Sequence, residues 1–439
     1  MRNVRRVLMV TPHFPPDSSA ASHRVRLLAP HLSEHGWEPT VLTVDPRDYE
    51  GGVEPALNAL VPPSLRIVRC RAWSASWTRP IGFGDLGLRA FVNLRATCRD
   101  LLRAQHFDAL FITLYPVYPA LLGPGLKRQF GVKFVLDYQD PWVGSWGLTV
   151  GGGPNGTPNA RSRLTRRVAT LLEPIAVRAA DAITAVSSGT YEEIVARIPS
   201  AGTLVRAALP VGWDRDDFAR VERAGSQPFF AAGDGLVHVA YVGTLLPKGI
   251  DTLRALLEAV RRLRDRDSDA YRRLRLWFLG TSNQFGSQSR GRVLPIAEEL
   301  GVTDVVREVA PRIPYGQAIA VLRQAHAIVL LGSTERHYTA SKLYPALLAD
   351  RPILAAFHEA SSVVDILARV GGGPSVRIVT YDDRGPGVEE VIDCLARHMA
   401  ALVRQPVTPA SFDLSPIEDV SARRLARKLC GVLDQISGS

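Results

Sequence analysis

Short apolar runs alternate with segments of helical periodicity along the first half of this chain. Strand-like runs occur at residues 4–11, 39–44, 65–70, 109–113, 133–137, 182–186 and 203–209. Apolar residues at helical spacing fit helices at 21–35, 86–105, 120–130, 163–180 and 189–198. Alternation of this kind is typical of a parallel sheet with helices on both faces.

The same alternation starts again after a charged, glycine-containing stretch. Strand-like runs occur at 237–242, 274–279, 305–309, 327–331, 352–357 and 376–380. Helical segments fit 251–264, 291–300, 316–324, 361–370, 388–403 and 422–436, and a further apolar helical run follows Lys342. The pattern predicts two doubly wound sheets in tandem, with ligands at the carboxyl ends of their strands and in the cleft between them.

We divide the chain accordingly into a first domain at 1–212, a linker at 213–235 and a second domain at 236–420. Ser421 is placed to cap the final helix, 421–436, which is a candidate to pack back on the first domain. A length of 439 residues suits two domains, each with its own core.

Composition adds an expected location to this architecture. No apolar run approaches the roughly 20 residues that a spanning helix needs, and the start of the chain leads directly into a strand, so we expect no signal peptide. The four cysteines lie far apart without metal-ligand spacing, which favours reduced thiols in a cytoplasmic protein.

The net charge of +10 comes almost entirely from arginine, because only five of the 53 basic residues are lysine. Nucleic acid, an anionic membrane face and acidic substrates are all compatible with such a charge. The chain lacks zinc-ligand spacing and aromatic–basic interleaving, so nucleic acid is the least favoured of these partners. Two of the rare lysines, Lys248 and Lys342, fall in loops that precede helices.

Residues 338–354 carry the clearest chemical pattern. A polar approach, Thr-Ala-Ser-Lys, precedes an apolar helical run that Arg351 and Pro352 end before a strand. If Ser341 caps this helix, the free N–H groups of its first turn face an incoming anion, and Lys342 adds a positive charge. The alternative is an ordinary capped helix joined to a strand.

Four further loops have comparable strand–loop–helix positions. Residues 11–24 follow the first strand with small side chains, and a surface loop with a serine cap is the alternative there. Asp140 follows the strand at 133–137, at an edge where ligands gather. Its carboxylate is a candidate to bind a sugar hydroxyl or to transfer a proton, and the alternative is that it caps a turn. In the second half, Gly243 would let a ligand approach the backbone closely, and the Lys248 ammonium is a candidate to bind a diphosphate oxygen. The backbone groups of the turn at 309–314 are candidates to bind a nucleobase, and a purely structural turn is the alternative.

In their order these segments resemble the retaining glycosyltransferases of family 4, which have the two-Rossmann (GT-B) fold. The resemblance covers nearly the whole chain. It is carried by residues 7–12 (VLMVTP), 32–43 (LSEHGWEPTVLT), 137–142 (DYQDPW), 180–187 (ADAITAVS), 241–243 (YVG) with Lys248-Gly249, 341–343 (SKL) and 351–354 (RPIL).

The resemblance implies an α/β protein with two doubly wound Rossmann-like domains facing across a cleft. A nucleoside-diphosphate sugar would lie mainly on the second domain, and a glycan, lipid-linked or small-molecule acceptor on the first. The sugar, a hexose, would be transferred with retained configuration, without a cofactor and without an obligatory metal. The setting implied is cell-surface polysaccharide synthesis.

The resemblance also assigns site residues by position. Asp140 and Glu335 are the candidate catalytic carboxylates. The donor-binding candidates are Gly243, Thr244, Lys248, Arg312, Ala340, Ser341, Lys342 and Leu343, with Lys248 and the helix start on the diphosphate and Arg312 near the base. The candidates for the acceptor and phosphate loop are Ser18, Ser19, Ala20, His23 and Arg24.

The chain departs from the family pattern at several of these positions. Thr244 stands where the family has an arginine, Gln139 where a histidine is common, and Ser18 to Ala20 where a glycine pair is usual. Pro345 stands at the place of the second glutamate of a paired motif. These departures admit a degenerate, non-catalytic binding subunit. A nucleotide-sugar 2-epimerase of the same architecture is the other alternative.

An apolar stretch in the first domain suggests a further partner. It contains Trp73, Trp77, Ile81, Phe83, Leu86 and Leu88 and leads into Arg89, Arg95, Arg99 and Arg103. A second basic helix spans 161–178. Basic amphipathic surface beside aromatic residues suits peripheral contact with the inner face of the cytoplasmic membrane. A core loop with solvated arginines is the alternative.

Overall fold

The computed structural model describes residues 4–80, 82–143, 160–223, 225, 229–231, 233–282, 290–333, 341–405 and 409–438, with backbone alone at 160–162. Contacts within the chain divide it into two compact units. The first comprises Met1–Asp214 and Val420–Ser439, and the second comprises Arg215–Asp419. Each unit is built on its own sheet.

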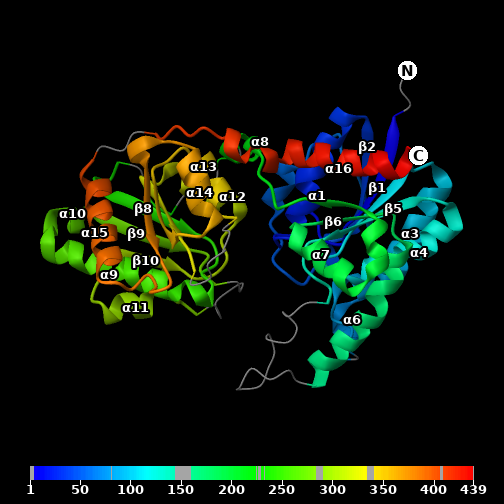
Figure 1. Cartoon of the computed structure of the whole chain (residues 1–439), viewed down its shortest axis with the longest axis horizontal. Helices are drawn as coiled ribbons and strands as arrows, with labels where there is room; N and C mark the ends of the chain where they lie inside the picture. The colour runs from blue at the N-terminus through cyan, green and yellow to red at the C-terminus, as the bar shows by residue number, and fades with distance from the viewer. Residues whose placement is uncertain are drawn as a thin grey trace. The chain divides into compact units, whose positions relative to one another are not determined.

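The first unit contains a seven-stranded parallel sheet in the order β3-β2-β1-β4-β5-β6-β7 (Figure 1). Its strands are β1 (Arg5–Val10), β2 (Trp37–Val44), β3 (Arg66–Cys70), β4 (Ala109–Thr113), β5 (Lys133–Tyr138), β6 (Ala182–Ala185) and β7 (Val205–Ala208). The direction of winding reverses between β1 and β4, which pair directly, with Val7 opposite Ala109. Such a reversal opens a crevice at the carboxyl ends of the two strands.

Helices cover both faces of this sheet. The helices are α1 (Ser22–Leu28), α2 (Ala75–Thr78), α3 (Leu86–Ala104), α4 (Leu122–Phe130), α6 (Ala160–Ala179), α7 (Ser188–Arg197) and α16 (Ala422–Ser437). Short 3₁₀ turns are η1 (Ala29–His35), η2 (Pro46–Asp48), η3 (Pro55–Leu60), η4 (Tyr118–Leu121) and η5 (Pro199–Thr203). One core lies under α3, α4, α6 and α7, and the other under α1 and α16.

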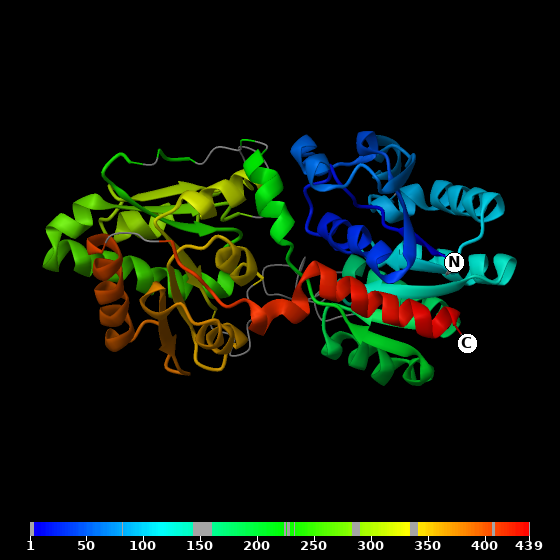
Figure 2. The same cartoon turned by 90° about the horizontal axis from the view of Figure 1, so that it is seen from above.

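The C-terminal helix completes the second of these cores. Ser421 caps α16 by accepting a hydrogen bond from the Arg424 N–H. Leu425, Leu429 and Leu433 then pack with apolar residues of β1 and β2 in one buried cluster. Figure 2 shows α16, in red, lying along the first unit.

The second unit contains a six-stranded parallel sheet in the order β10-β9-β8-β11-β12-β13. Its strands are β8 (Val237–Val242), β9 (Leu274–Leu279), β10 (Val306–Val309), β11 (Ala327–Leu331), β12 (Ile353–His358) and β13 (Val376–Tyr381). Here the winding reverses between β8 and β11, so the crevice expected for a ligand lies at their carboxyl ends.

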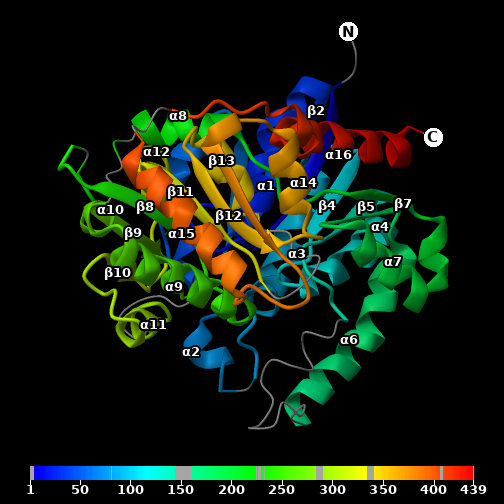
Figure 3. The same ribbon diagram turned by 60° about the vertical axis from the view of Figure 1, so that its left-hand side comes forward.

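Helices again lie on both faces. The helices are α8 (Arg215–Arg223), α9 (Ile250–Arg266), α10 (Ser268–Arg273), α11 (Leu294–Glu299), α12 (Tyr315–Gln324), α13 (Leu343–Leu348), α14 (Ser362–Arg369) and α15 (Glu389–Arg404). The 3₁₀ turns are η6 (Pro247–Gly249), η7 (Gly373–Ser375) and η8 (Ser415–Val420). Figure 3 shows α9 and α15 together on one face, where they form the main core with the sheet.

The prediction of two doubly wound parallel sheets is confirmed, whereas their facing each other across a cleft stays a prediction. Two local expectations were wrong. The segment assigned to a linker contains α8, and the helix expected at 21–35 is divided into α1 and η1 where Pro30 removes a backbone donor. Within the described residues, every helix is too short or too polar to cross a bilayer.

Candidate functional site

The carboxyl ends of β8 and β11 in the second unit hold a lysine that folds back over a glycine. Gly243 follows β8 with φ of 115°, a conformation that side-chain-bearing residues rarely adopt. A Cβ added to Gly243 would lie 2.8 Å from Cε of Lys342. Glycine is therefore required here both for the backbone conformation and for the lysine stem that lies against it.

The Lys342 ammonium contacts oxygen atoms and an aromatic face. Its Nζ donates hydrogen bonds to the Tyr241 hydroxyl and the Thr244 carbonyl. It also lies 4.4 Å from the centroid of the Tyr241 ring, within the range of a cation–π interaction. The Tyr241 hydroxyl in turn donates to the Thr244 carbonyl at 3.1 Å. We call Tyr241, Gly243, Thr244 and Lys342 the Lys342 site.

The charge of this site is not balanced by the described part of the chain. Burial lowers the pKa of Lys342 to about 7. No carboxylate among the described residues forms an ion pair with Lys342, and hydroxyl, carbonyl and ring contacts offset a desolvated charge only in part. A phosphate oxygen at this position would restore the charged form. The arrangement suits an anion.

The other donor-site candidates of the second unit surround this edge or lie outside the described residues. Lys248 is exposed on η6, and a Cβ on the next residue, Gly249, would meet the Gly332 carbonyl oxygen at the end of β11 at 3.3 Å. Arg312 is half-buried in the segment after β10. Glu335 and Ala340 lie outside the described residues.

The start of α13 differs from the expected capped helix. The helix begins at Leu343, Lys342 occupies the N-cap position, and no side chain caps it. Ser341 is exposed and does not cap the helix. Because α13 is only six residues long, the charge of Lys342, and not a helix terminus, is the candidate feature for an anion.

The loop after β1 in the first unit uses its polar groups internally. The Ser18 hydroxyl donates to the Gly52 carbonyl at 2.7 Å. Both the backbone N–H and the hydroxyl of Ser19 donate to Asp17, at 2.9 and 2.8 Å. Ala20 is exposed, and His23, half-buried on α1, accepts hydrogen bonds from Arg26. The structure thus gives both serines structural partners, Ser18 the carbonyl of Gly52 after β2 and Ser19 the carboxylate of Asp17 in the same loop.

Arg24 is engaged in the core of the first unit. Its guanidinium donates to both oxygens of Asp137, at 2.8 and 2.6 Å, and to the carbonyls of Leu209 and Pro210. Thr184 donates to the same carboxylate at 2.7 Å. Because Arg24 and Asp137 are almost completely buried, we assign them a structural role and no longer propose Arg24 as a phosphate ligand.

A histidine–aspartate pair in this loop escaped the sequence analysis. His13 follows β1 and contacts the Asp17 carboxylate through Nδ1. The signal was a histidine and an aspartate four positions apart around two prolines, which is unremarkable in sequence. The pair becomes apparent only when the loop folds beside β4.

Asp140 follows β5 and is exposed as a whole residue. Its carboxyl group is nevertheless partly shielded from water, and this desolvation raises its pKa. Trp142, two residues further, is half-buried and meets the Tyr118 ring edge-on at a centroid distance of 6.1 Å. Asp140 thus lies at the edge where ligands of such sheets gather, and its catalytic role stays a prediction.

The apolar stretch of the first unit divides into exposed and buried parts. Trp77 is 82% exposed, Trp73 54% and Phe83 49%. Arg89, by contrast, is buried and donates to the carbonyls of Trp73 and Asp48, so it belongs to the core and not to a basic surface. On α6 the exposed residues include Leu164, Leu171, Arg163, Arg166 and Arg167.

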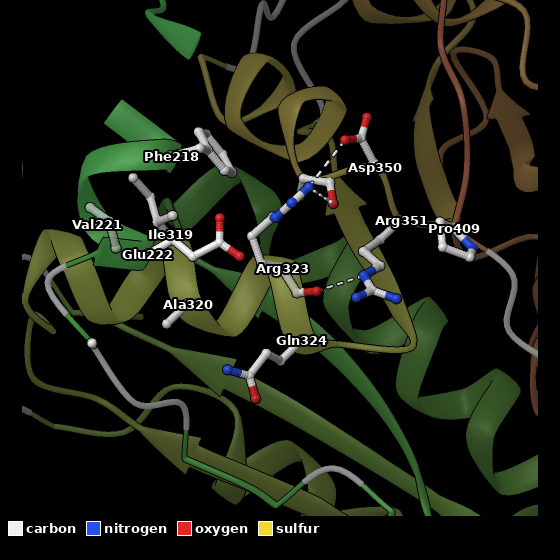
Figure 4. A pocket seen from close by; sticks show the side chains of 12 residues that line it. Phe218, Val221, Glu222, Ile319, Ala320, Arg323, Gln324, Asp350, Arg351 and Pro409 are labelled. Atoms are coloured by element: carbon white, nitrogen blue, oxygen red, sulfur yellow. Dashed lines mark hydrogen bonds and ion pairs between the residues drawn. The ribbon is translucent and has the colours of Figure 1, made fainter. Parts of the chain in front are cut away.

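A cavity of about 490 Å³ in the second unit lies between α8, α12 and the turn after α13 (Figure 4). Arg323 and Arg351 line it, and the Arg351 Nε donates to the Arg323 carbonyl. Arg351 precedes β12 and Gln324 precedes β11, so the cavity is at the amino ends of the strands. It is therefore separate from the Lys342 site, which lies at the carboxyl ends.

The described residues contain no cluster of three or more histidine, cysteine or carboxylate side chains suited to a metal ion. Lysine, tyrosine and a backbone carbonyl, the groups of the Lys342 site, are likewise not a divalent-cation set.

Comparison with known proteins places this geometry in context. Residues 19–207 match the family model described as a glycosyl transferase 4-like domain. A search of curated proteins gives no match. Many solved structures, however, share the fold.

Three of these structures span almost the entire chain. An α,α-trehalose-phosphate synthase (UDP-forming) from Burkholderia xenovorans is 12% identical with a TM-score of 0.56 over 98% of this chain and 100% of that one. A sucrose-phosphate synthase from Thermosynechococcus elongatus is 14% identical with a TM-score of 0.52, over 99% and 96%. Anabaena HepE in complex with UDP-glucose is 14% identical with a TM-score of 0.50, over 99% and 98%.

At such identities the likeness shows the fold alone. The expected GT-B architecture is confirmed by these structures, and the resemblance to family 4 glycosyltransferases is confirmed by the domain model over the first unit. The chain is thus glycosyltransferase-like in fold and in its first domain.

Proposed function

We propose that this chain, a GT-B protein with a glycosyl transferase 4-like domain, transfers a hexose from a nucleoside-diphosphate sugar to an acceptor with retained configuration. The observation that carries the proposal is the Lys342 site. A desolvated ammonium at the reversal point of a doubly wound sheet, without a carboxylate partner in the described residues, fits a diphosphate.

The chemistry required of this site is charge stabilisation. As the glycosidic bond of the donor breaks, negative charge accumulates on the leaving diphosphate, and a preorganised cation stabilises it. Lys342 supplies that cation, with Lys248 and Arg312 as the further donor contacts that we propose. The leaving phosphate then takes the proton of the acceptor hydroxyl on the same face of the sugar. Asp140 and Glu335 remain the proposed carboxylates near the reacting sugar.

The donor is tested by calorimetry with the full chain against UDP-glucose, UDP-N-acetylglucosamine, GDP-mannose and dTDP-glucose. UDP-glucose is the first choice because one structure of the same fold was solved with it. We expect one nucleotide sugar to bind and its diphosphate to be released slowly. Binding of none of the four would contradict the proposal. Lys248→Ala is expected to weaken binding by about 1.5–3 kcal/mol.

A degenerate binding subunit is the second candidate, and Pro345 favours it. Pro345 lies within α13, at the position where the family pattern has a glutamate. An inactive subunit would bind nucleotide sugar weakly or not at all and release no diphosphate. A 2-epimerase would instead convert the donor into its 2-epimer in the absence of an acceptor, which NMR of the reaction mixture detects.

We further propose that the first unit contacts an anionic membrane peripherally and takes a lipid-linked or growing glycan acceptor there. The exposed rings of Trp73, Trp77 and Phe83 and the exposed arginines of α6 support this contact. Both segments begin after carboxyl ends of strands, β3 and β5. Flotation with phosphatidylglycerol vesicles should carry the protein upward, and Trp77→Ala should reduce that fraction; no flotation at low salt would refute the contact.

A further inference from the structure

The reversal point of the first sheet holds a cluster that the donor chemistry leaves unused. His13 follows β1 and Tyr115 follows β4, the two strands between which the winding reverses. Asp85, the N-cap residue of α3, lies near His13, because the two side chains interact electrostatically. A crevice at such a point is where doubly wound sheets bind ligands. The question is which chemistry this cluster suits.

Asp17 is fixed as a hydrogen-bond acceptor. It is 2% exposed and accepts hydrogen bonds from the Ser19 N–H, the Ser19 hydroxyl and His13. Burial alone would raise its pKa, but the hydrogen bonds from His13 and Ser19 outweigh burial and hold the pKa below the usual value. An ionised carboxylate accepts hydrogen bonds and donates none.

This contact fixes the tautomer of His13. Because Asp17 only accepts, the ring nitrogen that faces it, Nδ1, carries the proton. In the neutral ring Nε2 is then an acceptor. Within the described residues Nε2 has no hydrogen-bond partner, and the side chain is 20% exposed. Nε2 thus belongs to a partly accessible ring that a buried carboxylate holds in place.

Aromatic rings frame this nitrogen. The His13 ring stacks on Tyr49 at a centroid distance of 6.0 Å and an angle of 19°. The Tyr115 ring is tilted against the His13 ring by 56°, at a centroid distance of 5.7 Å. The Tyr49 hydroxyl donates to the Phe14 and Val44 carbonyls and so anchors the ring behind His13, whereas Tyr115 is 42% exposed. Aromatic walls with a few placed polar atoms are typical of small-ligand sites.

We propose that His13 and Tyr115 form an acceptor subsite, in which His13 Nε2 accepts a hydrogen bond from a sugar hydroxyl and the Tyr115 ring packs against the sugar. Asp17 is a positioning residue that acts through His13. The ligand class is a neutral polyhydroxylated ring, because a sugar hydroxyl suits Nε2, a sugar face suits the Tyr115 ring, and the nearby cations Arg24 and Arg89 are already paired with Asp137 and Glu50. The subsite rests on the proposed transferase function and names its acceptor class.

The test uses the full chain and saturation-transfer NMR with methyl glycosides of glucose, galactose, mannose and N-acetylglucosamine. At least one glycoside should receive saturation from the wild-type protein. Tyr115→Ala and His13→Phe should each weaken its binding roughly tenfold, the size of one lost hydrogen bond or ring contact. His106→Ala is the matched control, because His106 is an exposed histidine beside Asp108 in the same unit.

Histidine ring ¹⁵N spectra separate a binding role from a structural one. In the wild-type protein His13 should show the Nδ1–H tautomer, and its Nε2 signal should shift when the glycoside is added. Asp17→Asn should change that tautomer and weaken binding, while circular dichroism stays that of the wild type. Unchanged glycoside affinity in Tyr115→Ala and His13→Phe overturns the proposal.

The donor measurement keeps the two proposals apart. If the wild-type protein binds none of the glycosides but binds a nucleotide sugar, the acceptor subsite is overturned and the donor function stands. If it binds a glycoside through His13 but no nucleotide sugar, the subsite stands as a sugar-binding site and the transferase function fails.

Discussion

Two cations, the buried Arg24 in the first unit and the half-buried Lys342 in the second, have opposite environments. Arg24 in the first unit meets a carboxylate through two hydrogen bonds and two backbone carbonyls besides. Lys342 in the second unit meets a hydroxyl, one carbonyl and a ring face. Each lies at or near the start of a short helix that follows a strand, Arg24 within α1 and Lys342 at the N-cap of α13, so position alone does not distinguish them.

The difference lies in whether the protein itself neutralises the charge. Asp137 satisfies Arg24, so that pair holds β5, α1 and the end of β7 together and leaves nothing for a ligand. The described residues leave Lys342 without a countercharge, and a phosphate group would supply one. Of these two cations, we therefore propose as a ligand contact only Lys342, for which the described residues supply no carboxylate.

The largest expected effect comes from breaking the satisfied pair. Arg24→Ala leaves the buried Asp137 carboxylate uncompensated and should lower the free energy of unfolding by about 3–5 kcal/mol. Urea denaturation measures it. The double variant Arg24→Met with Asp137→Leu should be markedly more stable than Arg24→Ala, because neither charge remains. A single-variant cost below about 1 kcal/mol, the range of exposed pairs, would show that the pair is not structural.

Lys342→Met should give the opposite pattern. Removal of a half-buried charge that no described carboxylate compensates should leave the free energy of unfolding equal or higher. Nucleotide-sugar affinity, measured by calorimetry, should fall by about 1.5–3 kcal/mol through loss of a charged hydrogen bond. Lys428→Met, at an exposed position of α16, is the control for loss of one positive charge. Equal donor affinity in Lys342→Met and the wild type would remove Lys342 from the site.

Proton linkage tests the same charge without mutation. Burial lowers the pKa of Lys342 to about 7, and a bound diphosphate raises it again by favouring the ammonium. Donor binding at pH 8 should therefore take up as much as one proton and weaken as the pH rises above 7. Calorimetry in HEPES and in Tris, which differ in ionisation enthalpy, measures the uptake. Equal observed binding heats in the two buffers would contradict the linkage.

The sign for stability is the reverse of that for binding. Because the unfolded chain holds this proton up to the ordinary lysine pKa near 10.5, the cost of burying the charge is fully present below pH 7. It is relieved as the pH rises from 7 toward 10.5. The stability difference between Lys342→Met and the wild type should therefore shrink over this range.

An exposed ion pair should give the smallest change in the free energy of unfolding. Arg254 donates to both oxygens of Glu299, at 2.6 and 3.0 Å, yet the two side chains are 46% and 57% exposed. Arg254→Ala should change the free energy of unfolding by only about 0.2–1 kcal/mol, because water and salt screen the pair. A cost like that of Arg24→Ala would mean that burial does not govern these interactions.

The alternation of strands and helices was predictable because buried parallel strands are continuous apolar runs. Helix α8 was not, because six of the nine residues of Arg215–Arg223 are charged. Its contacts lie far away in sequence. Phe218 and Val221 line the cavity beside α12 (Figure 4), and the buried Asp217 accepts a hydrogen bond from Tyr315. Tertiary packing, not local periodicity, makes that segment a helix.

The candidate site was predictable only in part. Lys342 stood out because lysine is rare here and follows a polar approach, but its turn onto Tyr241, 101 positions away, is a product of the fold. Arg24 looked like a ligand residue because Asp137, 113 positions away, was not known to face it. His13 and Asp17 are close in sequence, yet their contact depends on how the loop folds. In the folded loop Ser18 donates to the Gly52 carbonyl and the Ser19 N–H donates to Asp17.

The return of α16 has a consequence for biosynthesis. Leu425, Leu429 and Leu433 belong to the core beneath β1, a strand that is synthesised before the whole second unit. One face of that sheet therefore waits, with its apolar side chains uncovered, while the whole second unit is translated. To fold by itself, the first unit would need residues 420–438 joined directly after residue 214, and a stop codon before α16 would send an unfinished hydrophobic surface to the quality-control machinery of the cell.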